Sequence, residues 1–257
     1  MDIYHAVSSG QTDTVRLLLD EGADVNARNV WYQTPLQAAA WEGEIDVVQL
    51  LLDKGAKVNA QGGQYGTALQ AAAGTGVTKT VQLLLDRGAN VNARGGIYGT
   101  ALQAAVLRGV RETVQLLLDR GANVNAQGGE YGTALQAAAS ERAIEIVQLL
   151  LDRGADVNAQ GGIYGTALQA AASKEDMEIV QLLLDRGADV NVQGGIYETA
   201  LQAAAYRGIT DIVRLLLDND ANVNTEGGEY RTALHAATIS RNPEVVQLLL
   251  DGDLSSI

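Results

Sequence analysis

Hydrophobic and polar positions follow one pattern of 33 residues along this chain, with no insertion or deletion between copies. The motif Thr-(Ala or Pro)-Leu-Gln begins at Thr34 and returns at 67, 100, 133, 166 and 199, with the variant TALH at Thr232. Met1 occupies the same slot in an irregular first unit. Internal periodicity of this length indicates a repeat architecture. We therefore divide the chain into eight units, the last one incomplete: 1–28, 29–61, 62–94, 95–127, 128–160, 161–193, 194–226 and 227–257.

The first half of each unit predicts a short capped helix. In the unit 62–94, Thr67 precedes the segment ALQAAAG, and Gln70 stands three residues after Thr67. This spacing predicts a capping box, in which the Thr67 hydroxyl accepts from the Gln70 backbone N–H and the Gln70 side chain reaches back to the Thr67 N–H. The nearly bare alanine face of the helix lets a neighbouring helix approach closely. In the last unit, His235 is expected to take the position of the Gln.

The second half of each unit predicts another helix and a loop. After a turn around Gly76, Val81, Leu84 and Leu85 fall on one helical face. Gly88 then ends the helix in the left-handed conformation, which glycine adopts without a Cβ penalty. The following ANVNARGGIYG has no helical period and carries paired glycines, so it predicts an extended loop or hairpin.

Neither helix can bury its apolar face alone, whereas stacked units form a continuous core. The fold class expected is an all-α solenoid of about eight helix-turn-helix units with hairpin loops, forming one domain over 1–257. The segment TPLQAAAWEGEIDVVQLLLDKGAKVNA, from Thr34 to Ala60, closely resembles the ankyrin repeat, and the resemblance covers essentially the whole chain. The wording GGxYGTALQAA also resembles the ankyrin arrays of fungal NLR-type and other multidomain proteins.

Departures from the ankyrin pattern point to weaker units. The glycine between the two helices is replaced by Arg142, Glu175 and Arg241, and the helix-ending glycine is replaced by Asp220. If the positions between the helices require positive φ, each replacement costs about 1–2 kcal/mol, so units five, six and eight should be the weaker ones. A tyrosine also recurs every 33 residues, at Tyr32, Tyr65, Tyr98, Tyr131, Tyr164, Tyr197 and Tyr230. It either forms a binding ladder or packs between neighbouring hairpins; its constancy favours packing.

Charge and composition restrict the partners. With 18 basic and 31 acidic residues, the chain has a formal net charge of −13 and would be repelled by nucleic acid and anionic membranes. Basic or neutral partners are therefore favoured. The absence of cysteine excludes disulfides and thiolate sites. The sequence shows no basic segment followed by an apolar run at its start and no apolar run of membrane length. A cytoplasmic protein is expected, with a nuclear location also compatible.

Catalytic chemistry is not indicated. The glycine-rich tips lack the Lys of a phosphate-binding loop, and His5 and His235 are seven units apart. The carboxylates of Asp53, Asp86 and their equivalents repeat with the period, as solvated helix ends do. We expect no cofactor, no metal and no enzymatic activity.

Binding residues are expected where the units differ. The resemblance implies that a partner protein contacts the hairpin tips and first helices, which together line a concave face. The candidates at those positions are Trp31, Trp41, Ile97, Leu107, Arg108, Ile163, Ile196, Tyr206 and Arg207. Both tryptophans fall in this set, and Trp, Tyr and Arg dominate binding hot spots. The alternative for the tryptophans is that they cap the end of the stack.

The function favoured is non-catalytic protein recognition by a pre-organised scaffold. One alternative is a ligand-sensing segment of a larger receptor that docks in cis, for which the chain would be a piece of a longer protein. Others are an enzyme or small-molecule binder with a pocket between units, and an engineered scaffold, against which the irregular tips argue. A monomer is expected unless the C-terminal end of the stack, which lacks a clear polar cap, self-associates.

Overall fold

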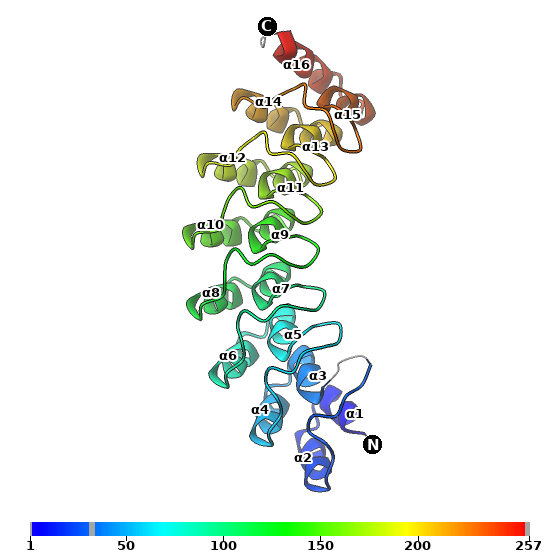
Figure 1. Ribbon diagram of the computed structural model, residues 1–257, viewed down its shortest axis with the longest axis vertical. Helices are drawn as coiled ribbons and strands as arrows, with labels where there is room; N and C mark the ends of the chain where they lie inside the picture. Colours follow the sequence, from blue (N-terminus) through cyan, green and yellow to red (C-terminus); the bar gives the residue numbers. More distant parts are fainter. Residues whose placement is uncertain (1, 31–33, 255–257) are drawn as a thin grey trace. The chain divides into compact units, whose positions relative to one another are not determined.

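The computed structural model describes residues 2–30 and 34–254 and divides into two compact units, Met1–Glu130 and Tyr131–Ile257. Each compact unit is built from helix pairs linked by loops (Figure 1). Within the described residues there are sixteen helices and isolated β-bridges but no sheet, which confirms the predicted all-α class. That residues 1–257 form one domain concerns the relation between the two units and stays a prediction.

The helices of the first compact unit alternate between the first and second members of a pair. Its first helices are α1 (Ile3–Ser8), α3 (Pro35–Glu42), α5 (Ala68–Thr75) and α7 (Ala101–Arg108). Its second helices are α2 (Thr12–Asp20), α4 (Ile45–Asp53), α6 (Thr78–Asp86) and α8 (Arg111–Asp119). Successive first helices pack on one another through fully buried alanines such as Ala39 and Ala72.

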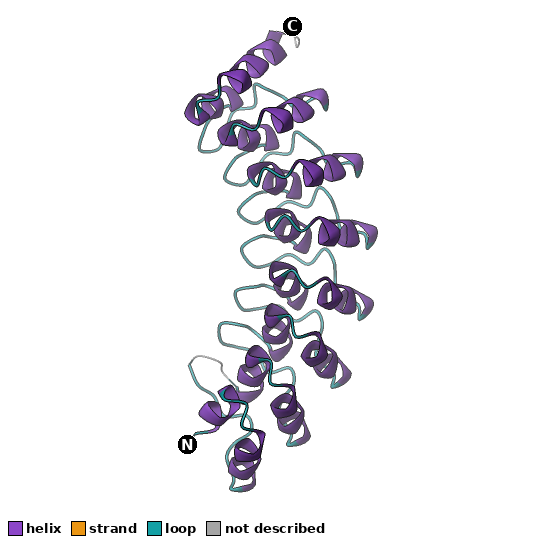
Figure 2. Ribbon diagram, turned by 180° about the vertical axis from the view of Figure 1, so that it is seen from behind, coloured by secondary structure: helices purple, strands orange, loops and turns teal. Residues whose placement is uncertain are grey.

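The second compact unit repeats this arrangement. Its first helices are α9 (Ala134–Ser140), α11 (Ala167–Ser173), α13 (Ala200–Arg207) and α15 (Ala233–Ser240). Its second helices are α10 (Ile144–Asp152), α12 (Met177–Asp185), α14 (Thr210–Asp218) and α16 (Pro243–Leu254). In both compact units, loops before first helices close as small hairpins, with bridges such as Gly62 to Gly66 before α5 and Gly194 to Glu198 before α13 (Figure 2). This confirms the predicted hairpins.

Capping of the first helices follows the sequence only in part. The hydroxyl of Thr67 accepts from the Gln70 backbone N–H at 3.2 Å, as predicted. The reciprocal half of the box is complete in α3, α9 and α13. At Gln70, however, Oε1 has no hydrogen-bond partner among the described residues, so the predicted return bond to Thr67 is wrong for this unit. In the last unit the His235 N–H donates to the Thr232 hydroxyl, which confirms its capping position.

The amide end of this glutamine has a role that sequence spacing did not reveal. Gln136 Nε2 lies 2.9 Å from the Gly161 carbonyl oxygen and 2.6 Å from that of Gly165, so it donates to the hairpin of the following unit. Tyr4 stands at the Gln position of the first unit, and its hydroxyl donates to the Ala27 carbonyl at 2.6 Å. The residue at this position of the repeat therefore lies in the first turn of a helix and also donates a hydrogen bond to the loop that follows.

Two further ladders join consecutive units. Asn59 Nδ2 donates to the Gly88 carbonyl at 3.0 Å, while its Oδ1 accepts from the Asn90 N–H at 2.7 Å. Several second-helix aspartates form ion pairs with the next unit, as Asp53 does with Arg87 at 3.0 Å. These aspartates are exposed, as expected for solvated helix ends, and they also form ion pairs. Exposed pairs of this kind contribute at most about 1 kcal/mol each.

The predicted positions of backbone strain are confirmed. Arg142, Glu175 and Arg241, which replace the glycine between the helices, have φ of 59°, 64° and 57°. Asp220, at the helix-ending glycine position, has φ 64°. The left-handed conformation costs a residue with a Cβ about 1–2 kcal/mol.

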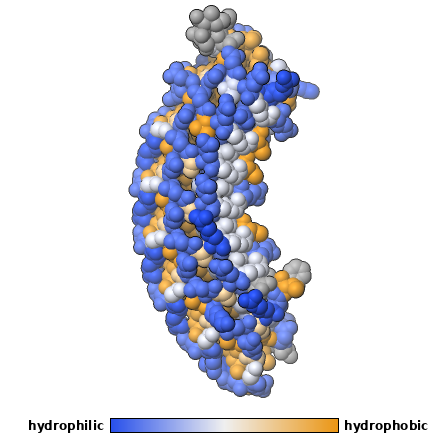
Figure 3. All heavy atoms as spheres, in the orientation of Figure 1, coloured by the Kyte–Doolittle hydropathy of each residue, from blue (hydrophilic) through white to orange (hydrophobic). Residues whose placement is uncertain are grey.

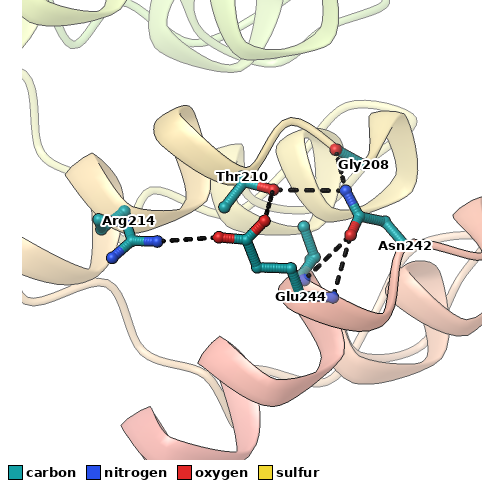
Figure 4. A network of polar contacts seen from close by, with 6 residues as sticks. Gly208, Thr210, Arg214, Asn242 and Glu244 are labelled. Atoms are coloured by element: carbon teal, nitrogen blue, oxygen red, sulfur yellow. Dashed lines mark hydrogen bonds and ion pairs between the residues drawn. The ribbon is translucent and has the colours of Figure 1, made fainter.

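A polar network fastens the last helix pair to the one before it (Figure 4). Asn242 Nδ2 donates to the Gly208 carbonyl at 2.8 Å, and Asn242 Oδ1 accepts from the backbone N–H of Glu244 at 3.0 Å at the start of α16. The Glu244 carboxylate lies 3.1 Å from Arg214 Nη2 on α14. This network attaches α16 to α14 beside the strained Arg241.

Candidate functional site

In each compact unit the hairpin tips and the adjoining ends of the first helices form an edge that we call the tip face. In Figure 1 the hairpins lie on the side of each first helix away from the second helix. Neighbouring tips are joined by backbone hydrogen bonds: the Ile97 N–H donates to the Gln64 carbonyl, and the Ile196 N–H to the Ile163 carbonyl, both at 2.9 Å. Gly96 permits this approach, because a Cβ there would lie 2.5 Å from the Tyr65 carbonyl carbon. The tips are therefore held in fixed register within each compact unit.

Trp41 and Tyr206 occupy the same repeat position and make the same contact. The Trp41 ring stacks on Tyr65 of the next unit, with centroids 4.0 Å apart. The Tyr206 ring stacks on Tyr230 of the next unit at 4.3 Å. Where Gly74 takes this position, the Tyr98 ring covers the glycine, and a Cβ would meet that ring at 3.0 Å. Alignment of the units by the 33-residue period could have found this equivalence, but only the fold shows the stacking partner.

The recurring tyrosines stack on their neighbours, apart from Tyr32, which lies outside the described residues. Centroid separations are 6.5 Å between Tyr65 and Tyr98, 6.3 Å between Tyr131 and Tyr164, and 6.2 Å between Tyr197 and Tyr230. In the second compact unit the Lys174 ammonium also lies over the Tyr164 ring, 5.7 Å from its centroid. The tyrosines thus pack between hairpins, which is the role that their constancy favoured.

Burial shifts the ionisation of these phenols. The pKa of Tyr65 is raised chiefly by burial, to which the neighbouring Tyr98 and the Glu42 carboxylate add. Burial likewise raises the pKa of Tyr197, against the opposing effect of Arg207. For Tyr230, burial is the main cause of a raised pKa, and the hydrogen bond that the neutral Tyr230 hydroxyl makes with Tyr206 adds to it. All three rings therefore remain neutral hydrogen-bonding groups at physiological pH.

The two candidate arginines are engaged in packing the units. Arg108 Nε donates to the carbonyl of Thr75, the last residue of α5, at 3.2 Å. Arg207 Nε donates to the carbonyl of Ser173, the last residue of α11, at 2.7 Å, and lies 3.8 Å from Glu175 Oε1. A cation at a helix C-terminus also satisfies the negative end of the helix dipole. Both arginines thus have a structural partner in addition to their exposed surface.

The remaining candidates divide between the two compact units. Ile97 is 52% exposed and Ile196 is 47% exposed, while Leu107 and Ile163 are half-buried. Trp31 lies outside the described residues. Figure 3 shows near-neutral residues with scattered apolar residues on the hairpin side and a mainly hydrophilic surface on the side of the second helices. An apolar side chain displayed beside partly buried aromatic rings is the arrangement expected of a contact surface.

A cavity of about 400 Å³ between α2 and α4 is lined by polar residues that include Arg16 and Asp53. The pKa of Asp53 is lowered mainly by the hydrogen bond from Gln49, which keeps the carboxylate ionised. No group of three or more His, Asp or Glu side chains suited to a metal ion occurs among the described residues. Among those residues no helix is long and apolar enough to cross a membrane.

Comparison with known proteins agrees with this geometry. A family profile described as "Ankyrin repeats (3 copies)" matches residues 3–62, 61–128, 103–194 and 168–256. The crystal structure of the human ASB11 ankyrin repeat domain is similar, with a TM-score of 0.73, 28% sequence identity, and coverage of 84% of this chain and 96% of that one. No curated protein sequence gives a significant match. The chain belongs to the ankyrin repeat family, whose members are generally non-catalytic and typically act as scaffolds for protein–protein interaction.

Proposed function

We propose that this chain recognises a partner protein with its tip face and performs no catalysis. The observation that carries the proposal is the display of Ile97 and Ile196, 52% and 47% exposed, on hairpins whose backbones are hydrogen-bonded to the preceding tip. Because those tips are already ordered, binding costs little conformational entropy. The half-buried aromatic rings of Trp41 and Tyr206, which stack on the tip tyrosines Tyr65 and Tyr230, supply further contact area.

The choice of this face over the second helices rests on where the units differ. The second helices repeat VQLLLD almost unchanged, and their carboxylates are engaged in ladders such as the pair between Asp53 and Arg87. The residue before each recurring tyrosine instead varies between Trp, Gln, Ile and Glu. A surface that is specific for one partner requires such variety, whereas a repeated structural contact does not.

Affinity capture from cell extract, read by quantitative mass spectrometry, tests the proposal. The parent chain is compared with Ile196→Asp and with the matched control Met177→Asp, which places the same charge on an apolar residue of α12 that is 42% exposed. A partner retained by Met177→Asp and depleted at least about tenfold by Ile196→Asp supports the tip face. Equal capture by both variants contradicts it. Circular dichroism and urea unfolding establish that both variants are folded.

A second candidate function is supported by the outer face of α15. Leu234 is 37% exposed, whereas its equivalents in the other units are 1–2% exposed: Leu36, Leu69, Leu102, Leu135, Leu168 and Leu201. Ile239 on the same helix is also exposed. This surface favours docking against a neighbouring domain in cis. Loss of a captured domain with Leu234→Asp, but not with Ile196→Asp, would favour this alternative.

A further inference from the structure

The last two hairpins, 194–198 and 227–231, differ from the earlier ones in backbone and in charge. The residue that closes the hairpin is glycine at 66, 99, 132 and 165 but Glu198 and Arg231 here, with φ of 68° and 63°. A residue with a Cβ is strained in this conformation. Strain retained by a structure that could use glycine is a recognised mark of functional segments.

Carboxylates gather at these two hairpins without a basic partner. Glu226 and Glu229 are exposed, and Glu198 is half-buried. The Glu198 side chain lies against the next hairpin, since a Cβ on Gly227 would be 2.6 Å from the Glu198 carboxyl carbon. None of the three carboxylates makes an ion pair or hydrogen bond with another described residue. Their charge is therefore available to a partner.

The basic side chains near these hairpins have partners of their own. Lys174, whose charge opposes the raised pKa of Tyr197, lies over the Tyr164 ring. Arg207 is directed to the Ser173 carbonyl and Glu175, so Arg231 is the basic residue contributed by the two hairpins themselves. The wider surface has the same sign, because residues 131–257 contain 18 acidic and 8 basic side chains, against 13 and 10 in residues 1–130. A cation approaching this part of the tip face is attracted both locally and at a distance.

Apolar and aromatic groups lie among the same carboxylates. Ile196 is 47% exposed at the tip of the first of these hairpins. Tyr206 stacks on Tyr230, and Tyr197 lies 6.0 Å from Tyr206 between ring centroids. The faces of tyrosine rings attract cations as well as apolar side chains. The surface thus combines an apolar contact, three aromatic rings and unpaired negative charge.

We propose that hairpins 194–198 and 227–231, together with Tyr206, bind a partner segment in which an apolar side chain stands next to lysine or arginine. The inference rests on the proposed function and specifies the chemistry of its partner. Ile196 contacts the apolar side chain, and the carboxylates of Glu198 and Glu229 receive the cation. Charge complementarity of this kind accelerates association and excludes acidic competitors. The hairpins 62–66 and 95–99 carry no charged residue, so they do not share this specificity.

Selection from a random 12-residue peptide library displayed on phage provides the probe. The expected result is enrichment of peptides that place Lys or Arg within three residues of a large apolar residue. A fluorescein-labelled peptide from the enriched set is then titrated by fluorescence anisotropy against the parent chain and the double variant Glu198→Gln, Glu229→Gln. We expect the double variant to bind about tenfold more weakly and to depend less on salt. The control variant Glu145→Gln, Glu178→Gln removes two exposed carboxylates from α10 and α12 and should bind like the parent.

The outcomes separate this inference from the proposed function. Binding that Ile196→Asp abolishes but the double variant leaves unchanged would overturn the charge specificity while supporting recognition by the tip face. Enrichment of acidic or uncharged peptides would also overturn the charge specificity while supporting recognition by the tip face. Failure to enrich any peptide, or binding that neither Ile196→Asp nor the double variant affects, would count against both.

Discussion

The ring of Tyr206 lies face to face with the ring of Tyr230 from the following unit, with centroids 4.3 Å apart and planes inclined by 18°. In the first compact unit, Trp41 and Tyr65 have the same relationship at 4.0 Å and 16°. One residue position of the repeat therefore decides whether a tip tyrosine is covered by an aromatic ring or by a small side chain. The same rings stabilise the stack and form part of the surface proposed for binding.

Removal of the Tyr206 ring should destabilise the second compact unit. Ser140 and Ser173 occupy the equivalent position in other units, so Tyr206→Ser leaves the helix intact. We expect a loss of about 1–2 kcal/mol, because a stacked aromatic pair contributes about 0.5–1.5 kcal/mol beyond its buried area. Urea unfolding followed by circular dichroism measures this loss. Ser173→Ala is the matched control, and an equal effect of the two variants would contradict a role for the stack.

The buried glutamines that cap the first helices should contribute more to the free energy of unfolding than the exposed glutamines of the second helices. Gln136→Ala removes the acceptor of the Thr133 N–H and the donor to the Gly161 and Gly165 carbonyls. Leaving such buried groups unpaired costs about 1–3 kcal/mol each, so we expect a loss of roughly 2–4 kcal/mol. Gln148→Ala removes only an exposed contact with Asp152 and should cost less than about 0.5 kcal/mol. Chemical denaturation of the two variants makes the comparison, and similar midpoints would contradict the ladder's importance.

Relief of left-handed strain should stabilise the chain. Asp220, with φ 64°, replaces the glycine found in the same position as Gly187, whose φ is 83°. Asp220→Gly is expected to raise the free energy of unfolding by about 1 kcal/mol. The reciprocal variant Gly187→Asp should lower it by a similar amount. Hydrogen exchange of the α14 and α16 amides reports the local effect, and a destabilised Asp220→Gly would show that the aspartate has another role.

Alkaline pH should weaken the first unit through Tyr4. Burial raises the pKa of Tyr4 from 10.0 to about 12. Its contribution to stability is therefore complete below about pH 10 and decreases as the pH rises towards 12, since the unfolded chain loses the proton first. Absorbance at 295 nm during an alkaline titration should contain a late component that Tyr4→Phe removes. A Tyr4→Phe variant with an unchanged titration curve would contradict the assignment.

The 33-residue period by itself determined the helices, because capping threonines and helix-ending glycines act within a few residues of the chain. The same locality let the sequence identify Arg142, Glu175 and Arg241 as strained positions. Sequence spacing also located the tip positions and the tyrosine row. These predictions depend only on interactions within one repeat unit.

Contacts between units were decided by the tertiary structure. The Gln136 amide finds its carbonyl partners 25 and 29 residues away, and the Arg207 side chain finds the Ser173 carbonyl 34 residues away. Such partners depend on how one unit is rotated and translated onto the next, which no local pattern encodes. Burial and pairing likewise decide which tip side chains are available, leaving Ile196 and Glu229 open while Arg207 is engaged. The sequence therefore determined the repeating unit, and stacking determined which of its residues face a partner.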